Sequence, residues 1–304
     1  MNKIQYIALV VLLLALFSCK DKFVNDIDIE VPETELQLAI NLELTAGDTT
    51  ASTFVARTSN INEPASTFFS DALVELYKED ALIGILDFDN YENVYIANLL
   101  PEDLVEGEYT VEVSGIEGFD DIKSTQIIPE QINILDVTYQ EDGTIEEDYG
   151  YAYTVDEATV KFKDPADQEN YYQVFIIAGI EDENGNLIFQ REFSPSSINP
   201  FAETSLYYKG VLINDQSFNG QEFNLSLGIN GGQINIADPD QTPYIIVELN
   251  NISKDNYLYQ RSLAAHLNAV DNPFAEPVVV HNNIENGIGI FRTSNSSNFR
   301  IDLE

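Results

Sequence analysis

The chain has 304 residues, of which 44% are hydrophobic, and this length is enough for two domains with buried cores. It carries 14 Lys and Arg against 52 Asp and Glu, a formal net charge of −38, which opposes binding to nucleic acid or to an anionic membrane surface. Two His residues and one Cys exclude a zinc site built from four cysteines, or from two cysteines and two histidines. The composition therefore predicts no cofactor and no metal.

Residues 1–18 have the pattern of a lipoprotein signal peptide. Lys3 gives a basic start, and residues 7–17 are an unbroken apolar stretch, too short for a membrane-spanning helix of about 20 residues. Leu16-Phe17-Ser18-Cys19 then resembles a bacterial lipobox, in which the Cys is lipidated and becomes the mature N-terminus. An ordinary secretory signal with a chance Cys is the alternative.

Residues 19–32 are expected to be a polar tether from the lipidated Cys19. The string Cys19-Lys20-Asp21-Lys22 partly resembles the surface-export signal of Bacteroidota lipoproteins, a Lys followed by acidic residues, although Lys22 interrupts it. The sequence thus predicts lipid anchoring in the outer membrane, with exposure at the cell surface favoured over the periplasmic side. Because there is no second Cys, an internal disulfide is excluded and stability must come from core burial.

Residues 33–139 are predicted to form an Ig-like β-sandwich. From Leu36 to Leu44, every second residue is Leu or Ile, which is the period-two pattern of a strand with one buried face. Turn-forming residues separate six further short apolar runs, and this spacing is typical of a sandwich. These strands are expected at residues 50–58, 72–78, 82–87, 93–98, 108–114 and 124–128.

A second β-rich domain, sandwich-like or barrel-like, is predicted for residues 151–304, after an acidic linker at residues 140–150. Asn184-Gly185 signals a hairpin turn. Ser253 is expected to cap a helix over residues 254–270. The strands of this domain are expected at residues 152–163, 171–180, 187–193, 222–229, 244–250, 277–281, 288–293 and 298–303.

Two long connections in this domain, residues 194–220 and 230–243, are rich in turn-forming residues, and loops of such length are uncommon unless they are functional. The first contains four aromatic residues that are candidates for binding a partner or ligand, because aromatic side chains offer large contact areas at low entropic cost. They are Phe201, Tyr207, Tyr208 and Phe218. The alternative is that these rings form a small satellite core beneath the loop.

Several strings resemble a family of Bacteroidota outer-membrane lipoproteins known as domain of unknown function 4249. They are Phe162-Lys163-Asp164-Pro165, Asn170-Tyr171-Tyr172, Val247-Glu248-Leu249, Tyr257-Leu258-Tyr259, residues 272–277 (NPFAEP) and residues 282–291 (NNIENGIGIF). The resemblance runs from the lipobox to the final predicted strand, and the last string is its most specific part. It implies an exported outer-membrane lipoprotein, frequently encoded beside TonB-dependent receptors, with no established catalytic residues.

Glycines and ionisable residues give weaker signals of chemistry. Gly287 and Gly289 leave one face of a strand bare, which favours close packing over a nucleotide loop, because a third glycine and a following helix are missing. His266 and His281 are expected at the edge of a core. Carboxylate pairs for glycoside hydrolysis stay open, because the sequence does not give their separation. The acidic strings at 87–90 and 181–184 could hold Ca²⁺, but hairpin turns are favoured there.

The leading functional hypothesis is a non-enzymatic cell-surface lipoprotein that docks with an outer-membrane β-barrel of the TonB-dependent receptor type. It would be an accessory to nutrient uptake or to outer-membrane protein assembly. The first alternative is a surface lipoprotein that itself binds glycan or peptide through the loop aromatics. An extracellular hydrolase is the least supported alternative.

Overall fold

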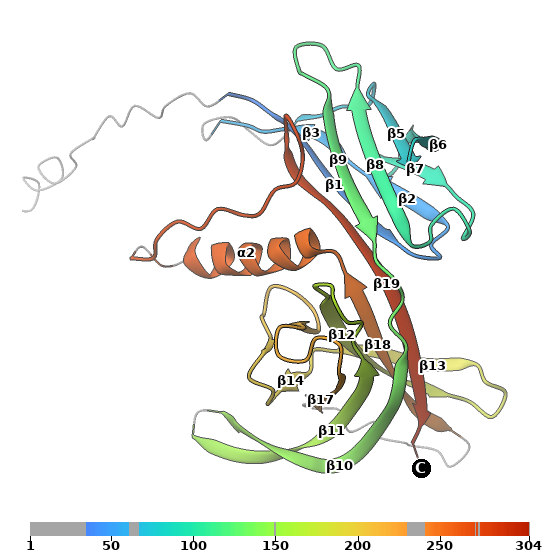
Figure 1. Cartoon of the computed structure of the whole chain (residues 1–304), viewed down its shortest axis with the longest axis vertical. Helices are drawn as coiled ribbons and strands as arrows, with labels where there is room; N and C mark the ends of the chain where they lie inside the picture. The colour runs from blue at the N-terminus through green and yellow to red at the C-terminus, as the bar shows by residue number, and fades with distance from the viewer. Residues whose placement is uncertain are drawn as a thin grey trace, which may run out of the picture. The chain divides into compact units, whose positions relative to one another are not determined.

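The computed structural model describes residues 35–60, 67–148, 150–229, 241–270, 272 and 274–303. The predicted signal peptide and tether, including Cys19, lie outside these residues. The described chain is mainly β-structure with one helix, α2 (Lys254–Val270), which confirms the predicted fold class (Figure 1). No helix in these ranges is long and apolar enough to cross a membrane.

The predicted N-terminal sandwich is present, and its strands enclose a first hydrophobic core. One sheet has the strand order β2-β7-β6-β5-β8-β9, and the strands β1, β3 and β4 belong to a larger, nine-stranded sheet. The bounds are β1 (Leu38–Thr45), β2 (Thr50–Thr53), β3 (Val55–Arg57), β4 (Thr67–Phe68), β5 (Leu73–Lys78), β6 (Ala81–Asp89), β7 (Val94–Asn98), β8 (Gly107–Ser114) and β9 (Ile122–Ile128).

Two details support the Ig-like description of this sandwich. In β1, Leu38, Ile40, Leu42 and Leu44 are all buried, as their alternation predicts. The buried Tyr109 hydroxyl accepts the Val105 N–H at 2.9 Å and lies 2.7 Å from the Asp103 carbonyl oxygen, to which it donates. This contact with backbone just upstream resembles the tyrosine corner of Ig-type sandwiches.

The second half of the chain surrounds a second hydrophobic core, between a four-stranded sheet and the rest of the nine-stranded sheet. Their orders are β10-β11-β17-β14 and β15-β16-β12-β18-β19-β1-β3-β4, with β13 paired to β12. The bounds are β10 (Ile134–Asp148), β11 (Tyr151–Lys163), β12 (Tyr171–Glu181), β13 (Leu187–Phe193), β14 (Ser196–Ser197), β15 (Ala202–Glu203), β16 (Val211–Asn214), β17 (Glu222–Ile229), β18 (Thr242–Ile252) and β19 (Ile288–Asp302).

Strand β19 serves both cores. Its first half pairs in parallel with β1, and its second half pairs antiparallel with β18. Phe291 accordingly lies in the first core, whereas Phe299 and Ile301 pack against the second. The two strands predicted at 288–293 and 298–303 are therefore one continuous strand that joins the two sandwiches (Figure 1).

The acidic linker predicted at residues 140–150 is wrong, because residues up to Asp148 belong to β10 and pair with β11. The chain passes between the cores earlier, since Ile128 lies in the first core and Ile132 in the second. The acidic composition of this segment indicates that its side chains are exposed to solvent. It does not indicate that the backbone lacks a pairing strand. A register shift between Gln140 and Thr144 interrupts the alternation that would have identified the strand.

Other sequence predictions of the second half also change. The predicted loop at residues 194–220 contains β14, β15 and β16, and Val211, Leu212 and Ile213 are fully buried. Residues 277–281 are not a strand: their backbone is fixed to α2 instead, through His266 Nδ1 with the Val278 carbonyl oxygen and the His281 N–H with Ser262 Oγ, both at 2.8 Å. Residues 230–240, most of the second predicted loop, lie outside the described ranges.

Candidate functional site

The four aromatic residues chosen from the sequence separate into different environments. Phe218 is only 3% exposed and stacks on Phe223 in the second core at 4.0 Å between ring centroids, so it is a core residue. Phe201 and Tyr207 are exposed. Tyr208 is half-buried and packs against a small cluster formed by Leu212, Ile252 and Tyr257. Tyr208 therefore belongs in part to a small satellite core, as the alternative predicted. Phe201 and Tyr207 lie at the surface, where they remain candidates for binding.

Tyr207 and Tyr208 come together with Tyr259 of α2 around a cavity of about 300 Å³, which we call the tyrosine cavity. The sequence predicts the helix that carries Tyr259, but only the tertiary fold brings this residue to the loop. The other residues lining the cavity are Glu43, Gln173, Phe175, Lys209, Gln260, Leu263 and Arg292.

A second cavity, of about 600 Å³, shares Tyr208 with the tyrosine cavity. Glu203 and Arg261 line it and form an ion pair, with 2.6 Å between Arg261 Nε and Glu203 Oε2. The Tyr257 hydroxyl also donates to Glu203 Oε1 at 3.1 Å. These contacts join β15 to α2, and Tyr208 lines both cavities.

The tyrosine cavity is polar but has no unpaired charge. Lys209 pairs with Glu192 at 2.8 Å, and Arg292 pairs with Glu43 at 2.7 Å. Burial raises the pKa of Tyr208 to about 12, so its hydroxyl stays protonated at neutral pH. Among the described residues, none of the Tyr207, Tyr208 and Tyr259 hydroxyls has a hydrogen-bond partner. The cavity therefore presents free hydroxyl groups next to neutralised ion pairs.

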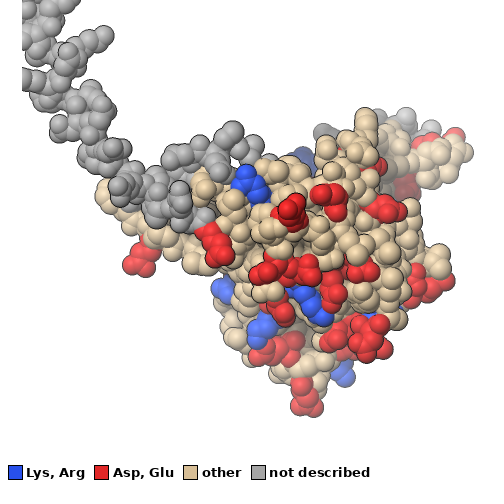
Figure 2. Space-filling model, turned by 90° about the horizontal axis from the view of Figure 1, so that it is seen from above, with Lys and Arg blue, Asp and Glu red and all other residues tan. Residues whose placement is uncertain are grey.

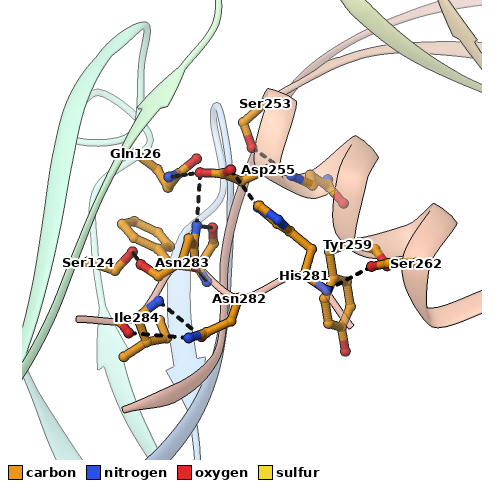
Figure 3. Close-up of polar contacts among 12 residues, drawn as sticks. Ser124, Gln126, Ser253, Asp255, Tyr259, Ser262, His281, Asn282, Asn283 and Ile284 are labelled. Atoms are coloured by element: carbon orange, nitrogen blue, oxygen red, sulfur yellow. Dashed lines mark hydrogen bonds and ion pairs between the residues drawn. The ribbon is translucent and has the colours of Figure 1, made fainter. Parts of the chain in front are cut away.

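A separate polar network surrounds Asp255, near the start of α2 (Figure 3). One carboxylate oxygen lies 2.7 Å from His281 Nε2, and the other accepts hydrogen bonds from Gln126 at 2.6 Å and Asn283 at 3.3 Å. Burial alone would raise the pKa of Asp255, but the hydrogen bonds from these three side chains outweigh it and hold the pKa below its usual value.

This network fastens the most specific string of the sequence, residues 282–291. The Asn283 side chain accepts the Phe291 N–H at 2.9 Å and donates to the Phe291 carbonyl at 2.8 Å, as a neighbouring strand would. Ser124 Oγ of β9 donates to the Asn283 carbonyl at 2.8 Å (Figure 3). The string thus braces β9, α2 and β19 against one another, which is a structural role.

Helix α2 begins as the sequence predicts. Ser253 Oγ accepts the Asn256 N–H at 3.3 Å, which is the geometry of an N-cap, and the Thr293 N–H at 3.4 Å. Near His281, Ser262 contacts the backbone N–H and not the imidazole ring. Within the described ranges, the His281–Asp255 pair therefore has no serine placed on its ring as a nucleophile.

The Asp255 network predicts a pH dependence of stability. Because its pKa is lower in the folded state, the Asp255 carboxylate stabilises the fold above its unfolded pKa of about 4, and this contribution is lost as pH falls through the folded pKa. The difference in free energy of unfolding between wild type and Asp255→Asn should be largest near neutral pH and shrink below about pH 4. Denaturant unfolding across this range measures it. The exposed Asp120→Asn is the charge-matched control, and a difference that stays constant with pH would contradict the assignment.

The two acidic strings considered for calcium are turns. Asp89 Oδ1 accepts the N–H groups of Tyr91 and Glu92, and Asp182 Oδ1 accepts those of Asn184 and Asn186. The hairpin at Asn184-Gly185 is confirmed, with φ of 77° at Gly185. Over the described ranges, no three His, Cys, Asp or Glu side chains form a group suited to a metal ion.

Comparison with known proteins gives one family. The search of curated proteins returns no match. The family model described as Domain of unknown function (DUF4249) matches residues 24–300, which include β1, α2, the Asp255 network and all but the end of β19. This match covers most of the chain and confirms the family that the sequence strings indicated. The chain belongs to the DUF4249 family.

Proposed function

We propose that this protein is a non-catalytic cell-surface lipoprotein that docks with an outer-membrane β-barrel, of the TonB-dependent receptor type, as an accessory to nutrient uptake or outer-membrane protein assembly. The lipobox-like string ending at Cys19 supports the anchor. The observation that carries the docking is the exposed apolar edge of β13.

Strand β13 offers both its side chains and its backbone to a partner. Leu187, Ile188 and Phe189 are 55%, 52% and 43% exposed, and alternate side chains of a strand point to opposite faces. Among the described strands, β13 pairs only with β12, so its other backbone edge is open. Exposed apolar edge strands favour association with a further strand, a recurring mode of protein recognition.

The chain that follows β13 continues this exposed apolar character. Ile198, Phe201 and Leu206 all have exposed side chains. Aromatic side chains at interfaces often carry much of the binding energy, which keeps Phe201 as a candidate anchor in addition to the β13 edge. We therefore assign the docking surface to residues 187–206, which combine exposed apolar side chains with an open strand edge.

Charge argues for a different protein as the partner, and against a second copy of this chain. Figure 2 shows Asp and Glu side chains spread over one face of the molecule, with Lys and Arg lying among them. Each chain has a formal charge of −38, so two copies repel one another. A partner that is neutral or basic at the contact meets no such repulsion.

Copurification from gently solubilised outer membranes tests the proposal. The double variant Ile188→Lys/Phe189→Lys should lose the barrel partner while keeping its melting temperature, because both side chains are already exposed. Leu82→Lys is the matched control, since Leu82 is 49% exposed in β6 of the other sandwich, and it should keep the partner. Cys19→Ala should release the protein from the membrane fraction.

Two results would contradict this proposal. If the wild-type protein incorporates no labelled fatty acid, the anchor is absent and the surface localisation is wrong. If the β13 double variant copurifies with the same barrel protein as wild type, docking does not use this edge.

A further inference from the structure

We propose that the tyrosine cavity binds a neutral oligosaccharide, an activity separate from docking through β13. The proposal rests on the tyrosine rings and hydroxyls that surround the cavity, on the pairing of every cation that lines it, and on the larger cavity that shares Tyr208.

The aromatic rings and hydroxyl groups of the cavity suit the apolar faces and the polar edges of a sugar ring. Sugar rings have faces of C–H groups that pack on aromatic rings, and edges of hydroxyl groups that donate and accept hydrogen bonds. Tyr207, Tyr208 and Tyr259 supply three rings around one cavity. Their hydroxyls have no partner among the described residues, so a ligand can bond them without breaking an existing contact. Tyr208, protonated at neutral pH, can donate.

Arg292 adds a donor that the protein leaves unused. Its guanidinium lies 5.9 Å from the centre of the Tyr259 ring and pairs with Glu43. Its Nε–H is buried and has no acceptor among the described residues. A buried donor without an acceptor is uncommon in folded proteins, and a small rearrangement toward a bound hydroxyl oxygen would satisfy it.

The paired charges favour an uncharged ligand. Lys209 and Arg292 are each neutralised by a carboxylate, and so is Arg261 in the neighbouring cavity. An anionic ligand would have to displace one of these carboxylates, and a cationic ligand would have to displace the Lys or Arg. Gln173 and Gln260 are likewise joined through their side-chain amides, with 2.9 Å between Gln173 Nε2 and Gln260 Oε1. What remains available is uncharged hydroxyl groups, aromatic rings and the Arg292 Nε–H.

The size and position of the cavities favour a chain of sugars. A cavity of about 300 Å³ is at the lower limit of ligand sites, enough for one end of a ligand. The neighbouring cavity of about 600 Å³, which shares Tyr208, gives space for further units. A peptide that binds through charged side chains fits less well, because the charges lining these cavities are already paired.

Calorimetric titration of the full mature chain tests the site. The probes are maltohexaose, cellohexaose, laminarihexaose, xylohexaose and mannohexaose, with hexagalacturonate as the anionic counterpart and an alternating Val/Thr heptapeptide as the peptide counterpart. At least one neutral hexasaccharide should bind, and hexagalacturonate should not. Tyr208→Phe removes one hydroxyl and keeps the ring, so it should weaken binding about fivefold to tenfold without changing the melting temperature.

Two further variants keep the test specific. Tyr207→Ala should abolish measurable binding, and Tyr91→Ala is its control, because Tyr91 is almost fully exposed in a turn of the other sandwich. The β13 double variant should bind sugar as wild type does, so loss of docking and loss of sugar binding are distinguishable. Absence of binding to all five neutral sugars overturns the proposal, and so does Tyr208-dependent binding of the heptapeptide in their place.

Discussion

Replacing Gly289 with Ala should destabilise the protein severely. Gly289 has a backbone φ of 120°, which residues other than glycine rarely adopt. It pairs with Ile40 in the parallel ladder between β1 and β19. A Cβ at this position would lie 1.8 Å from the Ile40 carbonyl oxygen, a distance at which the two strands cannot stay paired. We expect a loss of more than about 4 kcal/mol in the free energy of unfolding, measured by urea denaturation.

The control for this prediction is Gly118→Ala. Gly118 also has a positive φ, 86°, but a Cβ there would meet no atom within 4 Å. This variant should lose only about 1–2 kcal/mol in the free energy of unfolding, because alanine disfavours a positive φ and glycine does not. If the two variants are equally stable, the close approach of β1 and β19 at Gly289 does not exist.

Replacing Ile40 with Asp should be almost as damaging. Ile40 is 1% exposed in the first core, where an ionised carboxylate would have no partner. The Asp side chain would have to take up a proton, or the core would have to open to water, and either change costs free energy. The expected loss is on the order of 4–5 kcal/mol. In the control Asn41→Asp, the neighbouring side chain points to the opposite, partly exposed face of β1, and the change should stay within about 0.5 kcal/mol of wild type.

Thermal unfolding of the two β1 variants separates these outcomes. A large decrease for Ile40→Asp and a small change for Asn41→Asp are expected. Because a shift of one residue in register exchanges the two faces of a strand, equal decreases would mean that the assigned register of β1 is wrong.

The sequence predicted those parts of the fold that neighbouring residues determine, such as alternating strands and a capped helix. The alternation in β1 survives in the structure because one face is fully buried, and α2 begins after Ser253 because that side chain caps it. Strand β10 was missed because acidic residues fill its solvent-exposed end and a register shift breaks the alternation. Strand β16 was missed because four residues between turns carry too little periodicity.

The candidate site was predictable only in part. Aromatic composition identified Tyr207 and Tyr208, but it also selected Phe218, since composition does not show which rings are buried. Phe218 stacks on Phe223, whose place on a predicted strand could have suggested a core partner. Tyr259 and Arg292 reach the tyrosine cavity from α2 and β19, and no local pattern connects them to the loop.

The parallel pairing of β1 with β19 also determines the order in which the protein can fold. The Thr45 and Ser294 hydroxyls, 3.0 Å apart, join positions separated by 249 residues. A chain that emerges N-terminus first holds all of β1 long before its neighbour β19 exists, and the first core lacks Phe291 until then. Contacts between such distant positions form slowly, because a very long loop must close. Completion of the first sandwich is therefore a late step in folding, because it requires the last strand of the chain.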